Sequence, residues 1–99
     1  MAIDFNSFMI FCKGREGQTL PTAGGRAKFV LSSVQNDRLY YIVESTGKSR
    51  HSTRPWIEAV LNHYAKTKSL RPVDYQRVTF NASYTLSLIK LYLEHQRKR

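Results

Sequence analysis

The chain has 99 residues and a formal net charge of +9, from 16 Lys and Arg against seven Asp and Glu. This length suits a single domain with one hydrophobic core, and an apolar content of 41% excludes a chain that is disordered throughout. No apolar run reaches the length of a membrane span, and Asp4 precedes the first apolar run, so we expect neither a membrane helix nor a signal peptide. Cys12 is the only cysteine, which excludes an intrachain disulfide and favours a cytoplasmic location.

The positive charge is concentrated in the second half of the chain. Residues 1–46 hold five basic and four acidic residues, whereas residues 47–99 hold eleven basic and three acidic ones. Such an uneven distribution is typical of a surface that binds a polyanion, because charge that serves only solubility has no reason to concentrate. We therefore expect one domain, residues 1–99, in which 1–46 is mainly β and 47–99 is basic and mainly α.

The first half of the chain predicts strands. Phe5 to Lys13 is short, apolar and rich in aromatic residues, which is typical of a buried strand. Residues 14–26 contain four of the five glycines and predict a loop. Residues 27–34 and 38–45 are rich in Val, Ile, Tyr and Phe, and the residues between them suit a tight turn, so they predict a β-hairpin.

With Asn36-Asp37 at its tip, this hairpin pairs Leu31 with Ile42. That register assigns one set of apolar residues to the core, namely Val30, Val34, Leu39, Tyr41 and Val43. The opposite face also carries apolar residues, among them Phe29 and Tyr40. A sheet that is apolar on both faces requires cover on both, from helices or from another chain.

The second half predicts helices. One begins at Pro55, with Ser52 or Thr53 as its cap, and extends to about Lys66. Its apolar residues recur every three or four positions, so we interpret Trp56 as a core residue rather than a base-stacking one. The helical pattern breaks around Pro72, where a short helical turn is expected.

A final helix is predicted from near Asn81 to His95, and it is apolar nearly all round. Such a helix is either central to a core or half of a dimer contact. We expect a homodimer interface formed by one of its stripes, Leu86, Ile89 and Leu93. The predicted fold class is α+β, with a three-stranded antiparallel sheet followed by two main helices and a short helical turn between them.

The first candidate site is the basic, hydroxyl-rich stretch that precedes the Pro55 helix. The free backbone N–H groups at a helix N-terminus favour a bound phosphate. We therefore predict nucleic-acid contacts from Lys48, Ser49, Arg50, Ser52 and Arg54. A second interpretation treats residues 69–93 as a helix-turn-helix whose second helix enters a DNA major groove. It adds Asn81, Ser83, Ser87 and Lys90 to the predicted contacts.

A third geometry uses the sheet itself. Lys28, Arg38 and Tyr40, together with the 48–54 loop, could lie in a major groove. If Phe29 and Tyr40 are exposed, the same face could instead stack on single-stranded bases.

Catalytic and structural alternatives stay open. A metal-independent ribonuclease needs an acid, a base and a phosphate clamp. The residues that could supply them are His51, Arg50, Arg54 and Tyr41. Asp37 and Glu44 fit no metal-dependent nuclease pattern, and the histidines lack metal-ligand spacing, so we expect no metal or cofactor. A dimeric adaptor protein explains the extra apolar surface but not the charge asymmetry. We expect a non-catalytic, homodimeric nucleic-acid-binding protein, with DNA slightly favoured over RNA.

Overall fold

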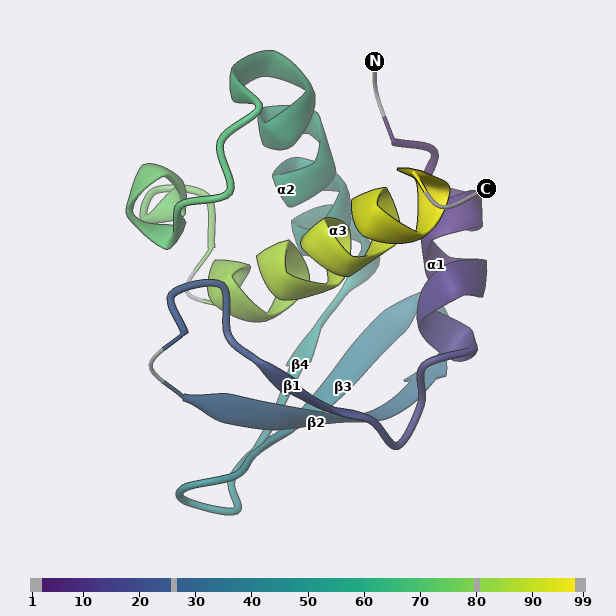
Figure 1. Cartoon of the computed structure of the whole chain (residues 1–99), viewed down its shortest axis with the longest axis vertical. Coiled ribbons are helices and arrows are strands. Elements are labelled where there is room, and N and C mark those ends of the chain that lie inside the picture. The colour runs from purple at the N-terminus through teal and green to yellow at the C-terminus, as the bar shows by residue number, and fades with distance from the viewer. Residues whose placement is uncertain (1–2, 26, 80, 98–99) are drawn as a thin grey trace.

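The computed structural model describes residues 3–25, 27–79 and 81–97. Their elements, in chain order, are α1 (Phe5–Lys13), β1 (Thr19–Pro21), β2 (Lys28–Gln35), β3 (Arg38–Val43), β4 (Ser49–Ser52), α2 (Arg54–Thr67), the 3₁₀ turn η1 (Pro72–Tyr75) and α3 (Ala82–Arg97). Within these described residues, four strands form an antiparallel sheet in the order β1-β2-β3-β4, and the helices lie together on one face of it (Figure 1). The fold is α+β. The expected arrangement of three strands followed by helices is wrong, because a helix comes first and the sheet has a further strand.

The segment predicted as the first strand is helix α1. Asp4 caps it, since its carboxylate accepts a hydrogen bond from the Ser7 backbone N–H at 2.9 Å. The buried residues recur at helical spacing and are Phe5, Phe8, Met9 and Cys12. Ile10 lies between them with 74% of its surface exposed, so it made a helical stripe resemble a continuous apolar run.

The predicted β2–β3 hairpin is confirmed, but its register is not the expected one. Asn36 and Asp37 form the turn with φ of 54° and 59°, a left-handed conformation that these side chains tolerate. The pairing then shifts between Leu31 and Ser33, so that Leu31 lies opposite Tyr41 instead of Ile42. A β-bulge therefore adds one residue to β2.

The bulge decides which apolar residues enter the core. It returns Phe29 and Leu31 to the same face as Val34, and all of them are buried beneath the helices. Of the predicted core face, Val34, Leu39 and Tyr41 are confirmed as buried. The assignment of Val30 is wrong, because strict alternation was counted through the extra residue and Val30 lies on the opposite face.

The other strands come from segments predicted as loops. β1 lies in the glycine-rich stretch and β4 in the basic stretch, and both are edge strands. The beginning of α3 contacts both of these edges. The Ser87 hydroxyl donates to the Pro21 carbonyl at 2.6 Å, and the Asn81 side-chain amide donates to the His51 carbonyl at 3.1 Å.

Helices α2 and α3 occupy the predicted regions. In α2 the residues Ile57, Val60 and Leu61 are buried, but Trp56 is 51% exposed, so its assignment to the core is wrong. In α3 the residues Leu86 and Ile89 are completely buried within a single chain. No helix of the described residues combines the length and the apolar character needed to cross a membrane.

Candidate nucleic-acid interface

The helices leave the opposite face of the sheet uncovered in the described part of the chain (Figure 1). Leu39 and Tyr41 of β3 point into the core, so the alternate residues of that strand point to the uncovered side. Strand pairing continues this set onto β2 and β4. We call it the open sheet face, and its members are Lys28, Val30, Ser33, Gln35, Arg38, Tyr40, Ile42, Ser49 and His51.

An aromatic pair lies near the middle of the open sheet face. Tyr40 and His51 are cross-strand partners whose rings stack with centroids 6.0 Å apart and planes inclined by 28°. Tyr40 is half-buried and His51 is exposed. Arg38, two residues before Tyr40, presents a guanidinium group to the same side. Aromatic rings and guanidinium groups contact nucleobases by stacking and by paired hydrogen bonds.

Positive charge continues from this face onto the exposed edge strand. Lys48 and Arg50 are exposed, and Gly47 before them has a φ of 70° in the turn that leads into β4. Among the described residues, no ion pair joins Lys28, Arg38, Lys48 or Arg50 to an acidic side chain. These cations are therefore available to an external polyanion.

The residues predicted to bind phosphate at the start of α2 do not share one environment in the structure. Lys48, Ser49 and Arg50 lie exposed on or beside β4, as a phosphate contact requires. Ser52 is instead buried and accepts a hydrogen bond from the Tyr41 hydroxyl at 3.1 Å. Ser52 therefore anchors β4 to the core.

Arg54 is engaged within the chain. Its guanidinium forms ion pairs with Asp37 at 3.3 Å and with Glu58 at 3.1 Å, and it lies over the Phe5 ring at 4.4 Å. These contacts join the β2–β3 turn, α2 and α1. Thr53 is the N-cap of α2 but makes no side-chain capping bond.

The residues predicted on a recognition helix do not form one exposed surface: Ser87 is buried, Asn81 and Ser83 are half-buried, and Lys90 is exposed. Ser87 is buried against β1 and Asn81 is bonded to β4, as described above. Ser83 is half-buried, and its carbonyl accepts the Ala23 backbone N–H at 3.2 Å. Lys90 is exposed on α3, on the helical side of the molecule. Since α3 packs against α1, α2 and η1, it does not present these residues together as one surface.

The residues considered for a ribonuclease do not assemble into one site. Tyr41 points into the core, where burial raises the pKa of its hydroxyl above the ordinary value, whereas His51 belongs to the open sheet face. Asp37 and Glu44 lie beyond opposite ends of β3. The described residues contain no group of three or more side chains that could hold a metal ion.

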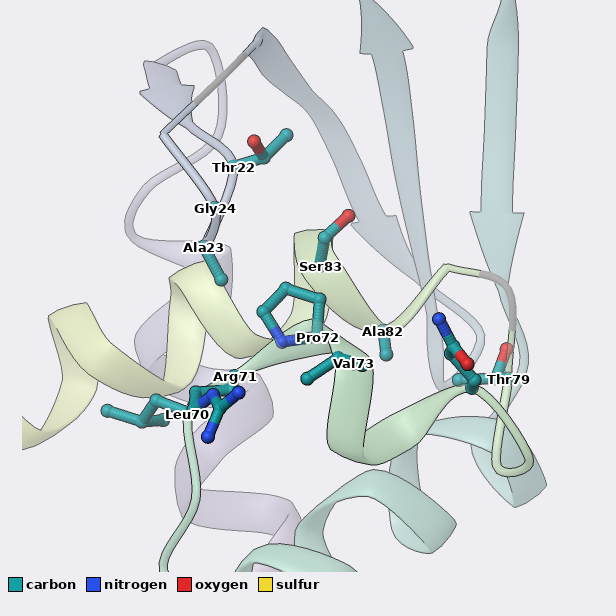
Figure 2. Close-up of a pocket in the computed structure, with 11 residues that line it drawn as sticks. Thr22, Ala23, Gly24, Leu70, Arg71, Pro72, Val73, Thr79, Ala82 and Ser83 are labelled. Carbon is teal, nitrogen blue, oxygen red and sulfur yellow. The ribbon is translucent and has the colours of Figure 1, made fainter.

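One hollow of about 920 Å³ lies between the loop after β1, the η1 segment and the start of α3 (Figure 2). Pro72, Ala23, Ala82 and Ser83 lie around its centre, and most of its lining is small or apolar. Another hollow, of about 380 Å³, lies where β4, the first turn of α2, residues 76–79 and Asn81 meet. We call it the β4–α2 pocket. Its lining includes Trp56 and Arg77.

The sequence analysis included His51 only as part of the 48–54 loop and did not predict its pairing with Tyr40 on the open sheet face. It did not predict Arg77 as a neighbour of Trp56. For His51 a signal existed, since Arg38, Tyr40 and Ile42 alternate and their partner strand must carry a matching set. For Arg77 no local pattern links it to α2, because the two segments meet only through tertiary folding. No protein-family model, curated protein or solved structure matches the chain.

Proposed function

We propose that the protein is a non-catalytic DNA-binding domain that lays its open sheet face on duplex DNA. The observation that carries this proposal is the stacked Tyr40–His51 pair on the uncovered side of the sheet, with the exposed cations Lys28 and Arg38 on the same side and Lys48 at the edge beside them. A major groove admits antiparallel β-strands, whose outward side chains then reach the base edges. Arg38 is the candidate for base contact, while Lys28 and Lys48 are candidates for phosphate contacts. Arg50 pairs with Tyr41, which points into the core, so its side chain lies on the helical side of the sheet and is not counted among these contacts.

The duplex is favoured over single-stranded nucleic acid by the position of Phe29. Binding of single strands by a sheet requires several exposed rings on which successive bases can stack. Phe29 was the second candidate ring, but it is fully buried and packs edge-on against Tyr41 and Tyr84. The open sheet face combines one aromatic pair with cations and small polar side chains, which suits groove and backbone contact better.

A single copy of the chain can present this surface. The expected dimer contact used Leu86 and Ile89, and both are occupied by the core of their own chain. Leu93 is partly buried and packs against the same core. The proposal therefore places no residue of a second copy in the binding site.

The experiment is fluorescence polarisation of a labelled DNA duplex at about 50 mM and about 200 mM salt. With Lys28 and Lys48 neutralising phosphates and Arg38 placed in the groove, the slope of log affinity against log salt should be about −2 to −3. The double change Arg38→Ala and Lys48→Ala should reduce the magnitude of that slope by about one to two units.

A matched control removes the same charges from the helical side. The double change Lys66→Ala and Arg97→Ala also deletes one Lys and one Arg, both exposed and on helices. It should leave the salt slope within about half a unit of the original. Equal effects of the two double changes would show that charge alone, and not the open sheet face, determines binding. Tighter binding to RNA or single-stranded DNA than to the duplex would contradict the choice of ligand.

A further inference from the structure

The β4–α2 pocket adjoins the open sheet face. His51 belongs to both, because its ring lies on the face and the residue also lines the pocket. The volume of about 380 Å³ lies within the ordinary range of small-molecule sites. A DNA duplex on the open sheet face would therefore have this hollow beside it, at the outer edge of β4.

Trp56 is the notable group in the pocket. It is the only tryptophan of the chain, it is 51% exposed, and it lines the hollow from the first turn of α2. No aromatic contact among the described residues involves its ring. An exposed indole beside a hollow is a surface on which a planar ring can stack.

The remaining lining supplies polar groups to such a ring. Gln76, Arg77 and Thr79 line the pocket together with Trp56; Gln76 and Arg77 are exposed and Thr79 is half-buried. An amide and a hydroxyl can hydrogen-bond the edge of a nucleobase, and a guanidinium can bind a neighbouring phosphate. In the described residues Arg77 forms no ion pair.

Resting on the proposed function, we propose that the β4–α2 pocket holds one unpaired nucleobase displaced from the bound duplex. The base stacks on Trp56, its edge faces Gln76 and Thr79, and Arg77 contacts the phosphate beside it. Displacing a base costs unstacking and unpairing energy, which is smallest for a base that already lacks a partner. The protein therefore prefers a duplex that contains an unpaired base.

The test compares a fully paired duplex with the same duplex in which one base lies opposite an abasic site. Fluorescence of the single tryptophan reports stacking directly, and polarisation of a labelled strand reports affinity. We expect the duplex with the unpaired base to bind about tenfold more tightly and to quench the fluorescence, since stacking of one base on an aromatic side chain gives a gain of this order.

Two variants test whether the unpaired base binds in the β4–α2 pocket. Trp56→Ala should abolish the preference for the unpaired base while leaving affinity for the paired duplex within about twofold. Val73→Ala is the matched control, because Val73 is equally exposed, at 51%, but lies outside this pocket. It should retain the preference. Thermal unfolding of both variants verifies that they are folded.

The outcomes separate this inference from the proposed function. Equal affinity of the wild-type protein for the two duplexes, or a preference that survives in Trp56→Ala, overturns the pocket while leaving DNA binding by the sheet in place. Absence of binding to either duplex overturns both proposals. Loss of the preference in Trp56→Ala alone, together with fluorescence quenching in the wild type, supports the pocket.

Discussion

Replacing Tyr41 with Phe tests what holds the edge strand β4 in place. The Tyr41 ring is fully buried, and its hydroxyl bonds the Ser52 hydroxyl at 3.1 Å and the Thr85 hydroxyl at 3.2 Å. These bonds connect β3, β4 and α3 inside the core. The substitution keeps the ring but leaves the hydroxyls of Ser52 and Thr85 buried without this partner.

The expected cost is about 2 kcal/mol in the free energy of unfolding, because a buried polar group that loses its hydrogen bond costs roughly 1–3 kcal/mol. With an m-value of about 2 kcal/mol per M, the urea midpoint should fall by about 1 M. Native-state hydrogen exchange should show faster exchange at the β4 amides than at those of the β1–β2 pairing.

Tyr84→Phe is the matched control for this change. The Tyr84 ring stacks on Tyr41 with centroids 4.9 Å apart, but no hydrogen bond of its hydroxyl occurs among the described residues. Its removal should change stability by less than about 0.5 kcal/mol. If Tyr41→Phe and Tyr84→Phe shift the urea midpoint equally, the buried hydroxyl cluster does not anchor β4 and the reasoning is refuted.

The same substitution has a consequence at alkaline pH. Burial raises the pKa of Tyr41 above its ordinary value of 10.0, so the folded state requires the neutral hydroxyl. The resulting stability is fully present below about pH 10 and is lost as the pH rises above it. Burial also raises the pKa of Cys12 above its ordinary value of 9.0, which adds to this loss. Urea midpoints between pH 8 and pH 11, roughly, should therefore decline less steeply in Tyr41→Phe than in the wild type.

Two further changes probe the core and its attachment. Ile89→Ala should lower the free energy of unfolding by about 3 kcal/mol, since it opens a cavity in a fully buried site. Ile89→Glu should unfold the chain. A folded, soluble Ile89→Glu monomer in sedimentation would instead restore the dimer-contact interpretation of α3. The pKa of Glu16 is lowered, first by the hydrogen bond its carboxylate accepts from the Val34 N–H at 2.6 Å and then by Lys13. Its stabilising contribution is present above its unfolded pKa of about 4.5 and is lost as the pH falls below that value. Glu16→Gln should accordingly flatten the acid limb of the stability profile, and an unchanged acid limb in urea titrations would contradict that role.

The sequence predicted those elements whose signals are local. The β2–β3 hairpin follows from its β-branched residues and turn, and α2 follows from Pro55 and an apolar stripe at helical spacing. The sequence of α1 also contains a helical signal, namely the capping residue Asp4 before Ser7 and the helical spacing of the buried residues. Its richness in aromatic residues indicated a strand instead, and that prediction was wrong. β4 has no such signal, because only Ser52 of its residues is buried and the strand exists through pairing with β3.

The same distinction between local signals and tertiary structure applies to the residues of the candidate site. Lys48 and Arg50 were predicted from their charge and are exposed, beside and on β4, whereas Ser52 and Ser87 were predicted from their hydroxyls and are buried. A hydroxyl serves equally well as a phosphate contact or as a buried link between elements, and only tertiary structure distinguishes the two roles. Trp56 was misassigned for a related reason, since the end of an apolar stripe can lie beyond the edge of the core.

Residues 81–87, at the start of α3, contact both edge strands of the sheet, and these contacts bear on how the protein avoids aggregation. An edge strand with free backbone groups is a template for strands of other copies. The Pro21 carbonyl of β1 and the His51 carbonyl of β4 are already occupied by Ser87 and Asn81, and Pro21 has no N–H to offer. Residues 81–87 thus occupy one backbone acceptor on each edge strand, which disfavours the addition of a further strand there. Loss of the Asn81 and Ser87 side chains would leave the His51 and Pro21 carbonyls free to accept hydrogen bonds from strands of other copies.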